Sequence, residues 1–227
     1  MARPHVLLSV AMSVDGYIDD MRDARVMLSN DEDLDRVDEV RASVDAILVG
    51  ANTIRRDNPR LLVRSMERQQ ERVRRGLAAH PIKVTMTGRG DLNTAARFFA
   101  AGDNEKLVYT RDPAVAALRK AVGDVATVVG AGEPIDLGVV LDDLAERKVE
   151  RLMVEGGSTI HTQFLTAGLV DEIHLVIAPF FVGDVSAPRF VHPGRFPQDP
   201  EHPMTLAETR QIGNVVLLRY LRGPSHA

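Results

Sequence analysis

Short apolar runs alternate with segments of helical pattern along most of the chain, and this alternation restricts the fold more than any other feature. The run AILV at residues 46–49 is bare of polar residues, which is typical of a strand buried on both faces. Comparable runs lie at 5–12, 82–86, 107–110, 125–129 and 152–154. Helical patterns lie at 31–44, 94–101, 112–122, 137–147 and 158–167. The alternation predicts an α/β fold with βαβ units, in which helices cover both faces of a mainly parallel sheet.

The C-terminal third has a different pattern. Residues 172–178 and 215–221 are predicted strands with no clear helix between them, which indicates an antiparallel edge. The apolar stretch 173–181 is either an edge strand at a subunit interface or a covered core strand. Five prolines between residues 188 and 203 predict an ordered surface excursion or a lid. Residues 65–79, rich in Arg, Glu and Gln, favour a solvated helix over an interaction surface.

The composition excludes several classes of function. With 227 residues the chain fits one large domain or two small ones, and we expect a single domain over 1–227. The net charge of −4 gives no reason to expect nucleic acid or an anionic membrane as a partner. The absence of cysteine excludes disulfides, thiolate catalysis and Cys-zinc sites. No signal peptide or membrane span is predicted, so we expect a cytoplasmic protein.

Two strand-to-helix turns carry glycine and a hydroxyl group. One is Gly50-Ala51-Asn52-Thr53, and the other is Glu155-Gly156-Gly157-Ser158-Thr159. Small residues let the backbone approach a ligand closely, and free N–H groups at a helix start attract phosphate oxygens. The pair would suit the two ends of a dinucleotide. The alternative is that such turns need glycine and a cap for structural reasons alone, and neither turn matches GxGxxG.

Other polar candidates follow the predicted strands. Thr87 and Arg89 share a turn that pairs a hydroxyl with a cation, so it is either a ribose-phosphate site or a surface turn. Acidic candidates are Asp15, Asp57 and Glu155, and cationic candidates for an anionic substrate are Arg41, Arg60 and Arg64. The seven histidines show no close metal-ligand spacing, so no metal site is predicted.

Several segments together resemble a known family. Residues 8–16, 41–53, 57–64 and 154–159 are similar, in order, to blocks of the riboflavin-pathway pyrimidine reductases, which share the dihydrofolate reductase fold. Residues 168–172 and 212–220 continue the resemblance, which therefore covers nearly the whole chain. The sequence departs from the family at Ser9, where many relatives have Lys. It departs again at residues 25–29, where RVMLS stands in place of a polar segment of the relatives.

The resemblance implies that NADPH delivers hydride to the ring-opened ribose imine of a phosphoribosylaminopyrimidine. Cofactor contacts are expected at Ala11, Gly50, Thr53, Asp57, Thr87, Arg89, Gly156, Gly157, Ser158, Thr159 and Ile160, within a stretch that continues to Gln163. Substrate contacts are expected at Arg41, Leu61, Arg64 and Glu155. The arginines suit a 5′-phosphate and Glu155 suits ribose hydroxyls. Asp57 is a candidate proton donor, and solvent is the alternative.

Three hypotheses about function stay open at this point. The first is the riboflavin-pathway reductase, with its deaminase on another protein. The second is a reductase of the same fold acting on another pteridine or pyrimidine, such as dihydrofolate. The third is a nucleotide-binding protein without catalysis. The resemblance also implies a homodimer.

Overall fold

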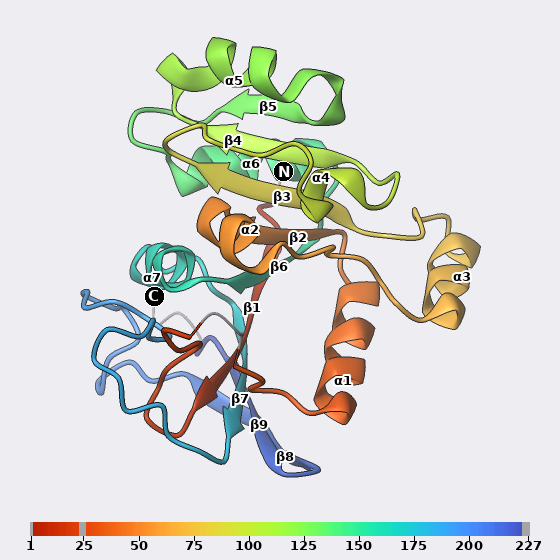
Figure 1. The fold of residues 1–227 in the computed structure, drawn as a ribbon. Coiled ribbons are helices and arrows are strands. Elements are labelled where there is room, and N and C mark those ends of the chain that lie inside the picture. Colours follow the sequence, from red (N-terminus) through yellow and green to blue (C-terminus); the bar gives the residue numbers. More distant parts are fainter. Residues whose placement is uncertain (1, 23–25, 224–227) are drawn as a thin grey trace. The chain divides into compact units, whose positions relative to one another are not determined.

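The computed structural model describes residues 2–22 and 26–223 (Figure 1). The chain divides into two compact units. Unit 1 comprises Met1–Pro4 and Asp38–Met153, and unit 2 comprises His5–Val37 and Val154–Ala227. Among the described residues, no helix is long and apolar enough to cross a membrane.

Unit 1 is built on four parallel strands. Their order is β5-β4-β3-β2, with Gly50 of one strand level with Met86 of the next. Three of these strands are almost fully buried, as the bare apolar runs predicted, whereas β5 has one buried residue, Val128. The strands are β2 (Ala46–Gly50), β3 (Ile82–Thr87), β4 (Lys106–Thr110) and β5 (Thr127–Gly130).

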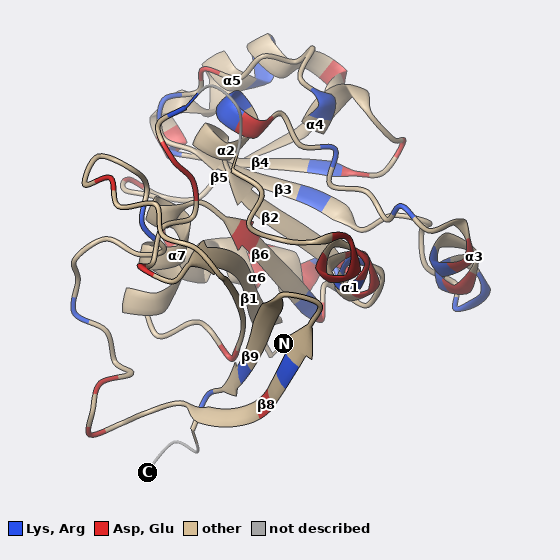
Figure 2. Ribbon diagram, turned by 60° about the horizontal axis from the view of Figure 1, so that its bottom comes forward, with Lys and Arg blue, Asp and Glu red and all other residues tan. Residues whose placement is uncertain are grey.

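Helices follow these strands along the chain of unit 1. They are α2 (Ala51–Asp57), α3 (Met66–Arg74), α4 (Arg97–Ala100), α5 (Val115–Val122) and α6 (Leu137–Glu146). The helix predicted at 94–101 is wrong in length, because residues 94–96 form a turn. Residues 112–114 are a 3₁₀ turn containing Pro113, and 123–125 are another, so β5 begins later than predicted. The charged segment after Ser65 does form a helix, α3, carrying both signs of charge (Figure 2).

Unit 2 contains the antiparallel strands. β1 (His5–Ser13) pairs in parallel with β7 (Glu172–Ala178), whose other edge pairs antiparallel with β9 (Val215–Leu221). β9 pairs antiparallel with β8 (Thr205–Ile212), which gives the order β1-β7-β9-β8. The predicted mostly parallel α/β architecture with an antiparallel edge is therefore confirmed.

The structure decides between the two alternatives for residues 173–181 and adds a strand that was not predicted. β7 has a partner on both sides, so the stretch beginning at Ile173 is a covered core strand and not an edge strand. β8 was not predicted at all. Seven of its eight residues are exposed or half-buried, so an edge strand of this kind shows no apolar alternation in its sequence.

Two elements span the boundary between the units along the chain. α1 (Asp31–Ala42) begins in unit 2 and ends in unit 1, and β6 (Arg151–Gly156) begins in unit 1 and ends in unit 2. The most buried side chains of α1 are charged: Asp33, Arg36 and Asp38. Its apolar positions Leu34 and Val37 are only half-buried. Buried charges are stable only when paired and hydrogen-bonded, so each of the three requires partners.

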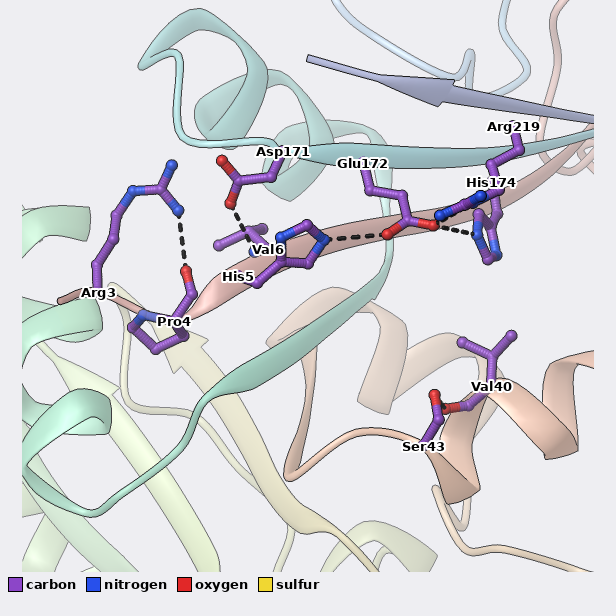
Figure 3. A network of polar contacts seen from close by, with 10 residues as sticks. All are labelled: Arg3, Pro4, His5, Val6, Val40, Ser43, Asp171, Glu172, His174 and Arg219. Carbon is purple, nitrogen blue, oxygen red and sulfur yellow. Dashed lines mark hydrogen bonds and ion pairs between the residues drawn. The ribbon is translucent and has the colours of Figure 1, made fainter. Parts of the chain in front are cut away.

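The buried carboxylate of Glu172 is the centre of a polar network in unit 2 (Figure 3). It lies 3.0 Å from Nε2 of His5, 2.8 Å from Nε2 of His174 and 2.5 Å from Nε of Arg219. The network continues from Nδ1 of His174 to Arg36, 3.3 Å away. Burial alone would raise the pKa of Glu172, but the hydrogen bonds from His174, Arg219 and His5 outweigh it and hold the pKa well below its usual range. The network fixes β1, β7 and β9 to one another.

Unit 1 contains a fully buried lysine. Nζ of Lys83 on β3 donates to the carbonyl oxygens of Phe98 (3.0 Å) and Ala101 (2.5 Å), at the end of α4. Burial lowers the pKa of this ammonium group to about 8. Both contacts are to the C-terminal turn of a helix, where a cation is favoured, so Lys83 caps α4.

Candidate active site

The glycine pair after β6 is the best-formed candidate in unit 2. Gly156 ends the strand with φ of +145°, a conformation that side chains rarely adopt. Gly157 is the N-cap of α7 (Ser158–Thr166), and no side chain caps that helix. The first N–H groups of a helix have no helical partner, so this start can offer them to a bound anion.

The hydroxyl groups at the start of α7 have different surroundings. Ser158 is buried, and its Oγ donates to the carbonyl oxygen of Arg189. Thr159 is exposed, and its Oγ1 lies 3.4 Å from Nε2 of His192. Ile160 is buried. Of these predicted cofactor residues, Thr159 therefore has the side chain that solvent reaches.

Glu155 and Ala11 complete the predicted residues of unit 2. Glu155 is half-buried, one position before Gly156 on β6. Ala11 on β1 pairs in register with Val176 of β7 and packs against two apolar clusters of the unit. A small residue at this position leaves the carboxyl end of β1 free of a bulky side chain.

In unit 1 the predicted cofactor residues lie at the carboxyl ends of adjacent strands. Gly50 ends β2 and is the N-cap of α2, again with no side-chain cap, while Thr53 lies half-buried in that helix. Thr87 ends β3, and its Oγ1 accepts a 3.0 Å hydrogen bond from the N–H of Gly90, which closes the turn that holds the exposed Arg89. In open α/β sheets, ligands bind at this end of the strands.

A contact between side chain and turn connects α2 to this region. Arg55 on α2 donates through Nε to the carbonyl oxygen of Asp91 at 3.3 Å, and Nη2 also contacts the Asp91 carboxylate. Asp57 is the last residue of α2 and is half-buried. It is followed by Asn58, whose φ of 44° ends the helix. The turn after β3 and the helix after β2 thus form one ordered edge.

The three predicted substrate residues of unit 1 lie near one another. Nη1 of Arg41 is 3.4 Å from the carbonyl oxygen of Leu62, which directly follows the buried Leu61. Leu61 itself has φ of +49°, an unusual conformation for a branched residue. Its backbone turn brings the following residues, including Arg64, beside α1.

Asp38 organises this arginine group and was missed by the sequence reasoning. Its carboxylate accepts hydrogen bonds from the N–H of Arg64 (2.5 Å), the N–H of Ser65 (3.0 Å) and Nη1 of Arg68 (3.0 Å). Burial alone would raise its pKa, but these bonds keep the pKa of Asp38 below its usual value. In the sequence the only signal was its position three residues before Arg41 on one helix.

Each unit contains candidate binding groups for part of a phosphorylated ligand. Unit 2 presents an uncapped helix start beside a carboxylate, and unit 1 presents cations beside the carboxyl ends of β2 and β3. Among the residues that the structure describes, no cluster of three or more His, Asp or Glu side chains fits a metal ion. Each set by itself suits the binding of a phosphorylated ligand by hydrogen bonds and charge.

Comparison with known proteins gives the geometry a context. The model of the family described as RibD C-terminal domain matches residues 4–218. Two similar proteins, from Archaeoglobus fulgidus and Methanothermobacter thermautotrophicus, are both named 2,5-diamino-6-ribosylamino-4(3H)-pyrimidinone 5′-phosphate reductase. The first is 34% identical over 82% of this chain and 85% of its own length, and the second is 38% identical over 80% of each.

A solved structure supports the fold. A pyrimidine reductase-like protein from Corynebacterium diphtheriae superposes with a TM-score of 0.81. The match covers 98% of this chain and 93% of the other, at 23% identity. At that identity, the likeness is evidence for the fold alone.

Proposed function

Because the chain belongs to the RibD C-terminal domain family, we propose that it is an NADPH-dependent reductase of a phosphoribosylaminopyrimidine in riboflavin biosynthesis. The observation that carries the proposal is the turn Glu155-Gly156-Gly157, which leads from a strand into an uncapped helix. This turn lies within residues 4–218, which the family model matches, and two similar proteins are named reductases.

The residues present fit a dinucleotide. The N-terminus of α7 supplies backbone N–H donors and a positive helix end, which suit the diphosphate. From the family resemblance, Thr53, Thr87, Asp57 and Ala11 are proposed as further cofactor contacts. Arg89 is exposed in the turn after β3, and its cationic side chain suits the additional 2′-phosphate that distinguishes NADPH from NADH.

The substrate residues follow from the charge that they offer. Arg41 and Arg64 are proposed to bind the 5′-phosphate, with Leu61 packing beside it. Guanidinium groups bind phosphate through forked, charge-assisted hydrogen bonds. Glu155 is proposed to accept hydrogen bonds from ribose hydroxyl groups.

The proposed reaction converts a ribosylamino group into a ribitylamino group. NADPH, when bound, supplies a hydride to the C1′ carbon of the ring-opened imine, and a proton must reach the imine nitrogen. The chain's contribution is to align the two carbons and to exclude water. Asp57 is the proposed proton donor, with solvent as the alternative source.

The names of the two relatives favour the diaminopyrimidinone form of the substrate over the deaminated uracil form. The two forms differ at C2 of the ring, which carries an amino group in the first and a carbonyl oxygen in the second. We therefore propose that the chain acts on the 2,5-diamino compound, and that the uracil compound is the poorer substrate.

Steady-state kinetics test the function. The purified chain should oxidise NADPH, followed at 340 nm, when given the diaminopyrimidinone phosphate. It should not do so with dihydrofolate. Turnover of dihydrofolate in place of the pyrimidine would support the second hypothesis. If the chain binds NADPH but turns over neither the diaminopyrimidinone compound, the uracil compound nor dihydrofolate, the third hypothesis, a nucleotide-binding protein without catalysis, is supported.

Three further properties stay predictions: the domain organisation, the oligomeric state and the location. We propose a single reductase domain over 1–227, in agreement with the continuous family match over 4–218. A homodimer is expected and can be checked by light scattering. A cytoplasmic location is expected and can be checked by cell fractionation.

A further inference from the structure

The proline-rich segment of unit 2 lies against the first turn of α7. Residues 188–192, which we call the strap, are joined to the loop after β1 by two backbone hydrogen bonds. The N–H of Ile18 donates to the carbonyl oxygen of Pro188 at 2.9 Å, and the N–H of Phe190 donates to that of Gly16 at 2.9 Å. This antiparallel bridge gives the strap a fixed base.

Side chains of one face of α7 bind the strap from the other side. Ser158 Oγ donates to the carbonyl oxygen of Arg189, and Nδ1 of His161 lies 3.3 Å from that of Phe190. Oγ1 of Thr162 accepts a 2.8 Å hydrogen bond from the N–H of His192. Positions i, i+3 and i+4 lie on one face of a helix, so these three side chains form a single row.

His161 is the most buried member of this row. Its side chain is 1% exposed, and its ring packs edge-on against Phe190 with centroids 5.4 Å apart. Because the carbonyl oxygen of Phe190 can only accept, Nδ1 carries the hydrogen. Burial lowers the pKa of His161 to about 4, so the ring is neutral at physiological pH. Nε2, on the side of Gly156, has no hydrogen-bond partner among the described residues.

The opposite face of the same turn is left open. Thr159 and Gln163 are exposed, while Ser158, His161 and Leu165 are buried. The strap therefore holds the buried face of the turn. Nε2 of its His192 also lies 3.4 Å from Oγ1 of the exposed Thr159, and the glycine start keeps its N–H groups without a capping side chain.

We propose that the strap holds the start of α7 in place for the dinucleotide, and that His161 and Thr162 are its positioning residues. This inference rests on the proposed function, since it takes α7 as the phosphate-binding helix. An uncapped helix start frays readily, and aimed N–H groups bind an anion well only when they are fixed before it arrives. Hydrogen bonds between the strap backbone and three side chains in the first five residues of α7 provide that fixation.

A matched pair of threonines tests the proposal. Thr162 and Thr166 each donate to the carbonyl oxygen four residues earlier, at 2.7 Å, but only Thr162 accepts an N–H from the strap. Thr162→Val should raise the Kd for NADPH roughly fivefold, the worth of one hydrogen bond. Thr166→Val should leave that Kd unchanged. Turnover at saturating NADPH should be preserved in Thr166→Val.

A second pair addresses His161. Asn can donate from nearly the position of Nδ1, whereas Leu has a similar volume and no donor. His161→Leu should weaken NADPH binding, and His161→Asn should keep most of the wild-type affinity. This order of affinities is expected even if the Leu variant has a higher Tm than the Asn variant. A purely structural role would instead move the Kd and Tm together in both variants.

The outcomes separate this inference from the proposed function. The Kd for NADPH is measured by fluorescence titration. If the wild type binds NADPH and the Kd is unchanged in Thr162→Val and His161→Leu, the strap's role alone is overturned. Equal Kd values for the Leu and Asn variants would do the same. Failure of the wild-type chain to bind NADPH would overturn both proposals.

Discussion

Glu172 and His174, two residues apart on β7, share a hydrogen bond of 2.8 Å between Oε1 and Nε2 that lies inside the folded unit. Residues at i and i+2 of a strand point to the same face, so β7 brings the two groups together by its own geometry. Arg219 of β9 and His5 of β1 complete the shell around the carboxylate.

Glu172→Gln should destabilise the protein at neutral pH by about 2 kcal/mol, the worth of charged hydrogen bonds. The folded-state pKa of Glu172 lies below its unfolded value near 4.5, so its contribution is fully present above that pH and is lost as pH falls further. The stability gap between wild type and variant should therefore narrow below about pH 4.5. Urea unfolding at a series of pH values measures it, with exposed Glu201→Gln as the control. A gap that stays constant down to pH 3 would contradict the role of the charge.

His161 and His174 should carry opposite neutral tautomers. Arg36 can only donate, so Nδ1 of His174 must accept and its hydrogen lies on Nε2. His161 donates from Nδ1 to the carbonyl oxygen of Phe190. Long-range ¹H–¹⁵N correlation spectra at pH 7 should resolve one histidine of each kind among the buried rings, assigned with His161→Asn and His174→Gln. Two rings with the same tautomer would mean that one of these contacts is absent.

Lys83→Met should remove a rise of stability at alkaline pH. The pKa of Lys83 is about 8 in the folded chain, against 10.5 for an ordinary lysine. Between these values the unfolded state binds more protons, so stability increases with pH. Neutral Lys83 still has two N–H groups for the carbonyl oxygens of Phe98 and Ala101. Denaturant unfolding between pH 7 and pH 10 should show the free energy of unfolding of the wild type rising relative to that of the variant. Parallel plots of this free energy against pH would refute the lowered pKa.

Asp38→Asn should impair the substrate side of the proposed reaction without affecting the cofactor side. An amide cannot replace both carboxylate oxygens, so the backbone at Arg64 and Ser65 loses part of its support. We expect a KM for the pyrimidine phosphate raised roughly tenfold, with the Kd for NADPH unchanged. Arg64→Gln should have the same effect, and Arg74→Gln, which removes a guanidinium that pairs with Glu71 on the surface, should have none. An unchanged KM in a folded Asp38→Asn variant would remove Asp38 from the substrate site.

Gly157→Val should weaken NADPH binding at least roughly tenfold, since a branched side chain at the N-cap blocks the approach of a phosphate to the helix start. The control is Ala167→Val, at the exposed C-cap of the same helix. Fluorescence titration with NADPH gives both affinities. Wild-type affinity in a folded Gly157→Val protein would exclude this turn from the cofactor site.

Local patterns in the sequence were enough for the parallel strands and for the two glycine turns. A strand such as β2 is apolar at every position because both of its faces are buried, so its composition alone identifies it. Helix starts without a capping side chain at Gly50 and Gly157 follow from glycine itself. β8 was not predicted from the sequence, because an exposed edge strand needs no apolar alternation.

What the sequence could not determine depends on contacts between residues far apart in the chain. The burial of Asp33, Arg36 and Asp38 on α1 contradicts the ordinary rule that a helix buries its apolar positions, and only tertiary partners make it possible. Asp38 becomes an organiser of arginines because the chain returns to it at residues 64–68. In the sequence nothing distinguishes His161 from the other six histidines, and only the folded chain brings it into contact with the strap. Periodicity and turn chemistry are local and can be inferred from neighbours in sequence. A hydrogen bond across 26 to 30 residues exists only once the fold has brought its two ends together.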